Sequence, residues 1–152
     1  MREITIKRAE QATEAVICAR MMVATEPWVT LGRTYEAALE MMMDPERELY
    51  VAEEAGVIRG FVLLVMSGGI KEGYIQSLCV VPYLRGEGIG GRLLDFAEER
   101  IGRALPAVYL MVSSFNEGAQ RLYGGRGYER VKVYKDYVVE GHDEILMCKR
   151  WE

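Results

Sequence analysis

The fold of this chain is decided by Val80-Val81-Pro82-Tyr83-Leu84-Arg85-Gly86-Glu87-Gly88-Ile89-Gly90-Gly91-Arg92-Leu93-Leu94. A strand-like apolar run, Ile75 to Val81, leads into it, and apolar residues at helical spacing follow from Ile89 to Ile101. Glycines between a strand and a helix let backbone N–H groups approach a ligand without a Cβ in the way. The start of the helix adds unpaired N–H donors and a partial positive charge. The sequence therefore predicts a cradle for phosphates at this turn.

The order of the residues excludes two common phosphate loops. A dinucleotide fingerprint needs G-x-G-x-x-G at the opening of a βαβ unit, whereas this chain has Arg85-x-x-Gly88-x-Gly90, late in its sequence. A P-loop needs G-K-[ST] at the start of the helix, and Gly90-Gly91-Arg92 differs from it. The cradle therefore belongs to another class of phosphate site.

A second segment reads Asn116-x-x-Ala119-x-x-Leu122-Tyr123-x-x-x-Gly127-Tyr128. The first stretch, an Arg-x-x-Gly-x-Gly loop preceded by Leu-x-Val-x-Pro, resembles the acetyl-coenzyme A (acetyl-CoA) pyrophosphate loop of the GNAT acyltransferase superfamily. The second segment resembles that superfamily's motif N-x-x-A-x-x-L/F-Y-x-x-x-G-F. Both stand in the family's order and are separated by one predicted helix and one predicted strand, as in the family. The resemblance covers the chain from about Gly73 to Tyr128.

The resemblance implies that acetyl-CoA is the cosubstrate and that backbone N–H groups from Arg85 to Gly91 bind its pyrophosphate. It also implies a bulged strand whose backbone pairs with the pantetheine arm, with Leu78 as the expected N–H donor to the thioester carbonyl. Asn116 is expected to cap a helix, to hydrogen-bond near the arm, or both, while Ser114-x-x-Glu117 competes as a capping box. Arg92 could contact a phosphate or be solvated. The residues expected to bind the cosubstrate are Leu78, Cys79, Val80, Arg85, Gly86, Glu87, Gly88, Ile89, Gly90, Gly91, Asn116 and Tyr123.

The resemblance also gives Tyr123 a catalytic task, although a core-facing helical tyrosine is the structural alternative. Its hydroxyl would protonate the departing thiolate, which a tyrosine with a pKa of about 10 can do at neutral pH. Leu78 and Tyr123 are therefore the expected catalytic residues. Cys79 is not expected to carry the acetyl group, because no basic activator is near it in sequence and a free cysteine is usually buried and inert.

No residue stands out as the base that deprotonates an amine. The ribosomal-protein N-terminal alanine acetyltransferases of the superfamily place a glutamate on the strand before the second motif, but Met111 fills the matching place here. This departure weakens the likeness to that subgroup. The remaining candidates, each also explained as a solvated surface group, are Glu26, Glu54, Glu72 and His142.

The acceptor side is expected at the segment from Glu26 to Arg33, which covers that side in the family. A loop that only connects two helices does not require a tryptophan and an arginine such as Trp28 and Arg33, and loops often carry substrate specificity. They are therefore the candidate acceptor-binding residues. The structural alternative is that Trp28 plugs the edge of the core.

Composition bounds the class of protein. The 152 residues are 50% apolar and 28% charged, which predicts one globular domain over residues 1–152. The net charge of −4 disfavours a nucleic-acid partner, and no apolar run reaches the length of a membrane span. Cys18, Cys79 and Cys148 lack C-x-x-C spacing and are typical of free thiols in a reducing cytoplasm. A single histidine and the lack of any cluster with ligand spacing predict no metal site.

Hydrophobic periodicity predicts the element order βααβββαβαββ, an α/β protein. The GNAT fold has this order, so we expect a mixed, mostly antiparallel sheet of about seven strands with about four helices on both faces. The expected helices are Gln11 to Thr25, Tyr35 to Met43, Ile89 to about Arg103, and Glu117 to Gly125. The expected strands are Ile4 to Ile6, Glu48 to Glu53, Ile58 to Met66, Gly73 to Val81, Ala107 to Val112, Tyr128 to Tyr137 and Glu144 to Lys149, the last two joined by Gly141-His142-Asp143.

The sequence thus predicts an acetyl-CoA-dependent N-acetyltransferase that transfers the acetyl group directly to an amine of a small molecule or a protein, as a monomer or homodimer. Three alternatives stay open. One is a protein N-terminal acetyltransferase, and one is a non-catalytic acyl-CoA-binding or sensory domain. The third is a small structural domain in which the glycines only form turns.

Overall fold

The computed structural model describes residues 2–66 and 73–151. The candidate base Glu72 and the expected loop Ser67-Gly68-Gly69 lie outside these residues. The described elements follow the predicted order, with a short 3-10 helix added inside the glycine loop. They are β1 (Thr5–Arg8), α1 (Ala12–Val23), α2 (Tyr35–Met42), β2 (Arg47–Glu54), β3 (Val57–Val65), β4 (Tyr74–Val80), η1 (Pro82–Leu84), α3 (Ile89–Gly102), β5 (Ala107–Ser113), α4 (Glu117–Gly125), β6 (Glu129–Val139) and β7 (His142–Arg150).

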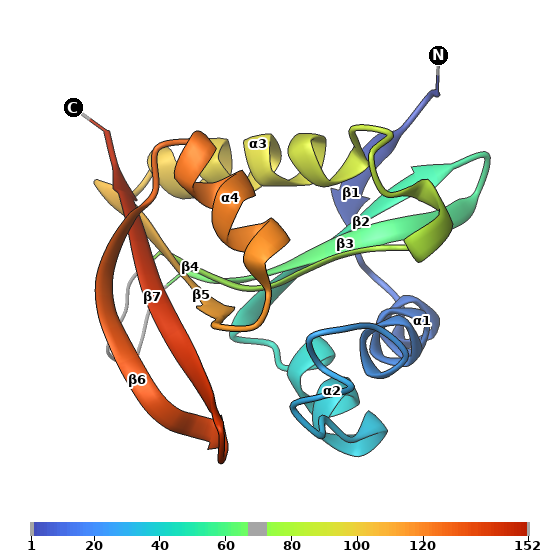
Figure 1. Ribbon diagram of the computed structural model, residues 1–152. Coiled ribbons are helices and arrows are strands. Elements are labelled where there is room, and N and C mark those ends of the chain that lie inside the picture. Colours follow the sequence, from blue (N-terminus) through green and yellow to red (C-terminus); the bar gives the residue numbers. More distant parts are fainter. Residues whose placement is uncertain (1, 67–72, 152) are drawn as a thin grey trace.

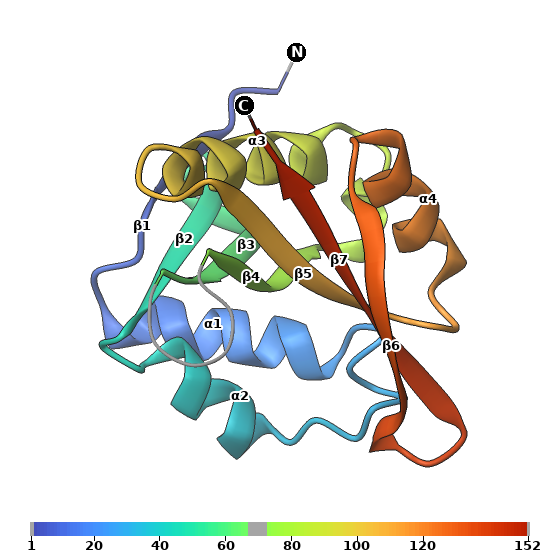
Figure 2. The same cartoon turned by 90° about the vertical axis from the view of Figure 1, so that its left-hand side faces the viewer.

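The strands form one seven-stranded sheet in the order β1-β2-β3-β4-β5-β7-β6. β4 and β5 pair in parallel, and every other neighbouring pair is antiparallel. α1 and α2 lie on one side of the sheet, and α3 and α4 lie on the other (Figure 1 and Figure 2). The predicted mixed α/β fold is confirmed.

Strand β3 shows how the two helical layers share the sheet. Val62 and Leu64 pack in a buried cluster with α3, whereas Phe61 and Leu63 pack in a second cluster with α1 and α2. A strand that is buried on both faces is apolar at every position rather than at alternate ones. The apolar run of β3 therefore follows from its place in the middle of the sheet.

The β6–β7 hairpin is tighter than expected. Gly141-His142-Asp143 was predicted to be the link, but Val139 pairs with His142, so His142 and Asp143 belong to β7. Gly141 takes a positive φ of 91°, a conformation that suits glycine and allows the chain to reverse within two residues.

Two irregularities in β4 prepare the functional site. A register shift leaves Gln76 as an extra residue between Ile75 and Ser77, a bulge of the kind the family resemblance implied. Pairing with β5 then covers only Tyr74 with Tyr109 and Ile75 with Leu110. Beyond Leu110 the two parallel strands separate, and the rest of β4 turns an unpaired edge toward β5.

Candidate active site

A cavity of about 800 Å³ lies where β4, the glycine loop, α4 and the α1–α2 segment meet. Its size falls in the usual range for a site that holds a small molecule or cofactor. Ten of the twelve residues predicted to bind the cosubstrate line it: Leu78, Cys79, Val80, Arg85, Gly86, Gly88, Gly90, Gly91, Asn116 and Tyr123. The structure therefore brings both sequence motifs to one cavity.

The glycine loop presents backbone donors along this cavity. Gly86 and Gly88 have φ values of 84° and 87°, the left-handed region that glycine adopts without strain. The first helical bond of α3 runs from the amide of Arg92 to the carbonyl of Gly88, so the preceding amides have no helical acceptor. The amides with no partner among the described residues are those of Gly86, Gly88, Ile89, Gly90 and Gly91.

Two other amides of the loop are already used. Those of Arg85 and Glu87 donate to the carbonyls of Pro82 and Leu84, both at 3.3 Å. The five remaining donors and the positive end of α3 are the features that the predicted anion site requires. The role of each amide toward a phosphate stays a prediction.

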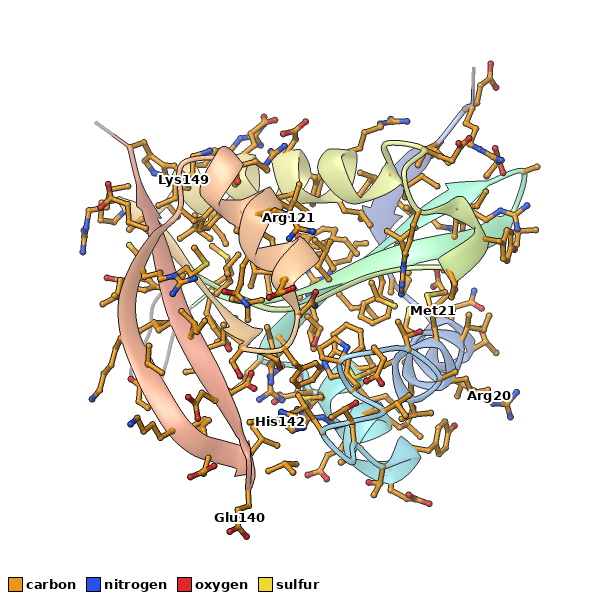
Figure 3. All side chains as sticks on the ribbon, viewed as in Figure 1. Arg20, Met21, Arg121, Glu140, His142 and Lys149 are labelled. Atoms are coloured by element: carbon orange, nitrogen blue, oxygen red, sulfur yellow. The ribbon has the colours of Figure 1, made fainter. Side chains whose placement is uncertain are left out.

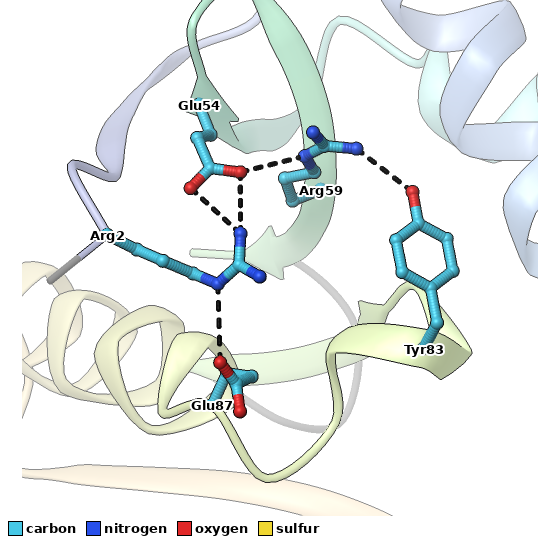
Figure 4. Close-up of polar contacts among 5 residues, drawn as sticks. All are labelled: Arg2, Glu54, Arg59, Tyr83 and Glu87. Carbon is cyan, nitrogen blue, oxygen red and sulfur yellow. Dashed lines mark hydrogen bonds and ion pairs between the residues drawn. The ribbon is translucent and has the colours of Figure 1, made fainter.

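A polar network braces the loop on its outer side (Figure 4). Arg2 binds Glu54 at 2.8 Å and Glu87 at 3.4 Å, and Arg59 binds Glu54 at 3.2 Å and the hydroxyl of Tyr83 at 2.9 Å. The carboxylate of Glu87 is therefore directed to Arg2, and this residue does not line the cavity. The network ties the N-terminal segment and the β2–β3 hairpin to the loop.

Two further side chains near the loop also hold the structure together. Ile89 is 1% exposed and packs in the core beneath α3, so only its backbone can serve a ligand. Arg92 donates from Nη2 to the carbonyl of Ile4 at 2.8 Å. Its guanidinium thereby anchors the chain ahead of β1.

The unpaired edge of β4 places backbone groups on the cavity side. The amide of Val81 donates to Arg59 of β3 at 2.9 Å, so Val81 and, by antiparallel alternation, Cys79 direct their backbone groups toward β3. Leu78 and Val80 then direct theirs to the opposite side, where β5 has separated. This is the orientation that the predicted role of the Leu78 N–H requires.

Asn116 caps α4. Its side-chain oxygen accepts from the amide of Ala119 at 3.2 Å, and the competing Ser114 to Glu117 box does not form the cap. Asn116 also lines the cavity, so the capping role and a place beside the ligand are compatible, as expected.

Tyr123 lies on α4 with its ring 5.7 Å from that of Tyr128. Burial raises the pKa of Tyr123 to about 12, so the phenol keeps its proton at neutral pH. Its hydroxyl makes no hydrogen bond within residues 2–66 and 73–151, whereas the Tyr128 hydroxyl donates to Glu98 at 2.9 Å. Tyr123 therefore has a proton to donate, and no group in the described part of the chain accepts it.

Cys79 also lines the cavity, but its side chain is 3% exposed. Burial raises the pKa of Cys79 to about 11, which keeps the sulfur as a thiol at neutral pH. Since the thiolate is the nucleophilic form, this environment does not suit an acetyl-carrying cysteine.

A second cavity of about 340 Å³ adjoins the first. Both are lined by Trp28, Leu78, Asn116 and Tyr123, so they meet where the predicted catalytic residues lie. Arg33 lines only the smaller cavity. Trp28 is 9% exposed and packs in the cluster with α1 and α2, so it belongs both to the core edge and to the cavity wall.

The structure brings none of the described base candidates into this second cavity. Glu26 binds the amide and hydroxyl of Thr30 at 2.8 and 2.7 Å, bonds that lower the pKa of its carboxyl. Glu54 is held by Arg2 and Arg59. His142 lies near the end of the hairpin (Figure 3), in a tilted ring contact with Phe115, and lines neither cavity.

Two polar residues that the sequence analysis missed do line the smaller cavity, Glu144 and Gln76. Glu144 is 6% exposed, and one of its oxygens accepts from Ser113 at 3.1 Å. Gln76 is the bulged residue of β4. One signal in the sequence could have identified Glu144, which directly precedes the apolar run Ile145 to Cys148. A carboxylate in a buried strand is rare, so such a residue is a candidate for a functional role.

Within the two described ranges, no helix is long and apolar enough to cross a membrane. In the same part of the chain, no group of three or more His, Cys, Asp and Glu side chains is placed to hold a metal ion.

An open parallel strand pair, a glycine loop at a helix start and a free tyrosine hydroxyl between two cavities define the site of an acyl-transfer enzyme. A family model described as an acetyltransferase (GNAT) domain matches residues 10–150. The chain therefore belongs to the GNAT acetyltransferase family, and the resemblance drawn from its two motifs is confirmed.

Individual relatives agree with this assignment. The chain is 37% identical over 103 residues to an uncharacterized N-acetyltransferase of Methanocaldococcus jannaschii, a match that covers 66% of this chain and 65% of that protein. It is 29% identical over 149 residues to the N-alpha-acetyltransferase RimI of Mycobacterium tuberculosis, covering 93% of this chain and 87% of that one. A GNAT acetyltransferase of Elizabethkingia anophelis, solved with acetyl-CoA bound, shares the fold at a TM-score of 0.75 and 19% identity, covering 97% and 98% of the two chains.

Proposed function

We propose that this acyltransferase moves the acetyl group of acetyl-CoA directly to an amine held in the smaller cavity. The observation that carries the proposal is the meeting of the two cavities at Leu78 and Tyr123. A donor in one cavity and an acceptor in the other would react across this junction, and holding both in place lowers the barrier.

The larger cavity suits acetyl-CoA, which supplies an acetyl thioester. The free amides from Gly86 to Gly91 and the N-terminus of α3 would hold its pyrophosphate. The edge of β4 would pair with its pantetheine arm, as an added strand does. The amide of Leu78 is directed to this side and would donate to the thioester carbonyl oxygen as negative charge develops there.

Tyr123 would act as the general acid. Its hydroxyl has no hydrogen-bond partner among the described residues, and the pKa of about 12 keeps it protonated at neutral pH, so it can donate to the sulfur as negative charge develops there. The same hydroxyl argues against a purely sensory acyl-CoA-binding domain, which would have no use for a proton donor at the junction.

The acceptor is either a small amine or the N-terminus of a protein. Acylation of a protein N-terminus is a second candidate because of the likeness to RimI. Met111, which lines the smaller cavity, stands where that subgroup has a glutamate, and this departure favours a small amine. The buried, unpaired thiols of Cys18, Cys79 and Cys148 suit a reducing cytoplasm, and we place the reaction there.

Release of free coenzyme A thiol, measured against a panel of amines, tests the proposal. The panel should contain amino acids, polyamines, aminoglycosides and short peptides with free N-termini. We expect release that depends on one class of amine and yields the acetylated amine in equal amount. Binding of coenzyme A with no amine-dependent release would instead support the sensory domain, and no binding would support a structural one.

A further inference from the structure

The smaller cavity holds a carboxylate that the proposed function has not used. Glu144 lies near the start of β7, opposite Ser113 of β5, and the Ser113 hydroxyl donates to its Oε1 at 3.1 Å. Its Oε2 is buried and has no hydrogen-bond partner among the described residues. A buried carboxylate oxygen without a donor is costly, so this atom is suited to accept a hydrogen bond from a bound molecule.

Gln76 presents a second such atom to the same cavity. Its side-chain nitrogen donates to the sulfur of Met41 at 3.0 Å, while its Oε1 is buried without a partner among the described residues. Two acceptor oxygens without donors, one of them charged, match the ammonium group of a primary amine, which has three N–H donors and a positive charge.

We infer that Glu144 is the base of this active site and that its Oε2 takes a proton from the ammonium of a primary amine bound between Glu144 and Gln76. The inference rests on the proposed acetyl transfer. It names the acceptor by chemistry, a protonated primary amine, and adds a catalytic residue on β7.

The proton balance of the step is complete. Glu144 removes one proton from the ammonium, and the freed nitrogen lone pair forms a bond to the thioester carbonyl carbon. The carbon–sulfur bond then breaks, and its electron pair leaves on the sulfur, which takes the Tyr123 proton. The nitrogen gives its second proton to the Tyr123 oxygen, directly or through water, and Glu144 releases the first to solvent. The net products are an amide, a free thiol and one proton.

The surroundings of Glu144 set the pH range in which it can act. Burial raises the pKa of its carboxyl above the ordinary value, and Asp143 adds to this, while the Ser113 bond, His142 and Arg33 oppose it. Tyr74 of β4 and Tyr137 of β6 also line the cavity, and burial raises the pKa of Tyr74 to about 12, so Tyr74 stays neutral. Glu144 is therefore a base above its raised pKa and loses that role as the pH falls through it.

The experiment compares Glu144→Gln with the wild type on two nucleophiles. Glutamine keeps the size of the side chain and can still accept from Ser113, but it cannot take a proton. With a primary aliphatic amine found in the panel, kcat/KM at pH 7 should fall by about 10²–10⁴-fold, the usual contribution of a general base. With methoxyamine, which is neutral at pH 7 and needs no base, the variant should stay within about threefold of the wild type.

The pH profiles give an independent readout. The wild type should lose kcat/KM at low pH, as Glu144 becomes protonated, and stay level above that range. Without the base only the neutral amine reacts, so kcat/KM of the variant should rise about tenfold per pH unit toward the pKa of the amine, about 10.4 for a lysine-like amine. A carboxylate that only supports the fold would not change the shape of the profile.

Three controls separate this role from others. Glu140→Gln removes an exposed carboxylate at the tip of the same hairpin (Figure 3) and should leave both rates and the profile unchanged. His142→Asn should keep the loss at low pH, which would show that the neighbouring imidazole is not its source. Ser113→Ala keeps the carboxylate but removes the bond that lowers its pKa. A smaller loss of rate is therefore expected, with the loss at low pH beginning at a higher pH, even if Glu144→Gln folds poorly.

The outcomes distinguish the inference from the function on which it rests. If the wild type acetylates no amine, the proposed function and the inference fail together. The inference alone is overturned if the wild type is active and Glu144→Gln shows any of three results. These are an unchanged rate with the primary amine, an unchanged loss of kcat/KM at low pH, or an equal fall in kcat/KM with both nucleophiles.

Discussion

The two cavities that meet at Tyr123 are built from different materials. The larger one is lined by five glycines and mostly apolar side chains, and it offers backbone donors from the free amides at the start of α3 and the open edge of β4. The smaller one is walled by side chains with polar ends from five separate parts of the chain: Arg33, Gln76, Ser113, Tyr137 and Glu144. A backbone site recognises features that every coenzyme A molecule shares, whereas a side-chain site recognises one acceptor.

The difference predicts that changes in the first cavity act on cosubstrate binding and changes in the second act on acceptor use. Substitutions in each cavity and at their junction test whether cosubstrate binding and acceptor use are separate.

The largest effect is expected for Gly88→Asp in the glycine loop. Its φ of 87° strains any other residue, and the carboxylate would stand among the donors meant for phosphate. Coenzyme A affinity should fall by at least about 100-fold, about 2.7 kcal/mol. The rise in melting temperature that the ligand gives the wild type should vanish.

Gly56→Asp is the matched control. Gly56 has a φ of 81° and lies in the β2–β3 turn, away from both cavities, so the substitution adds the same strain and charge elsewhere. It should keep the ligand-dependent shift. A folded Gly88→Asp protein with a normal shift would refute the assignment of the loop.

Tyr123→Phe acts at the junction and should have the next largest effect. The ring stays and the proton donor is lost, so turnover should fall by roughly 10–10³-fold while coenzyme A affinity changes little. Tyr128→Phe removes the neighbouring hydroxyl and its bond to Glu98, which should cost about 1 kcal/mol of stability but leave turnover near the wild-type value. If chemistry is rate-limiting and Tyr123→Phe turns over as fast as Tyr128→Phe, Tyr123 is not the general acid.

The smallest effect is expected on the acceptor side. For an amine that also carries a carboxylate or phosphate, Arg33→Ala should raise the KM by about tenfold, the loss of one charge-assisted contact, and leave the KM of acetyl-CoA unchanged. Trp28→Ala should differ, because Trp28 is buried in the core edge and lines both cavities. It should lower stability by about 3 kcal/mol and raise both KM values. A change in the acetyl-CoA KM of Arg33→Ala would show that the two cavities are not independent.

The same contrast explains what could be predicted from the sequence. The element order follows from hydrophobic periodicity. The ten cavity-lining residues follow from the two motifs, because a backbone site needs glycines and a helix start at fixed spacing. Glu144 lies 68 residues after Gln76 in the sequence, and only the order β4-β5-β7 in the sheet brings the two to one cavity. No local pattern marks such a pair, so Gln76 and Glu144 could not be predicted, whereas the predicted acceptor residues Trp28 and Arg33 do line this cavity.

Within the first motif, the sequence did not show which side chains of the loop face the cavity. Glu87 is held by Arg2, which lies 85 positions earlier in the chain, and Ile89 is drawn into the core beneath α3. Both outcomes depend on tertiary contacts, which override what the spacing of residues in a loop can indicate.

Direct transfer between the two cavities is the central claim, and initial rates measured over a grid of acetyl-CoA and amine concentrations test it most directly. If both molecules must be bound together, double-reciprocal plots should intersect, and mass spectrometry of enzyme incubated with acetyl-CoA alone should find no acetyl group on Cys79. Parallel plots together with an acetylated Cys79 would show a covalent enzyme intermediate and contradict the account.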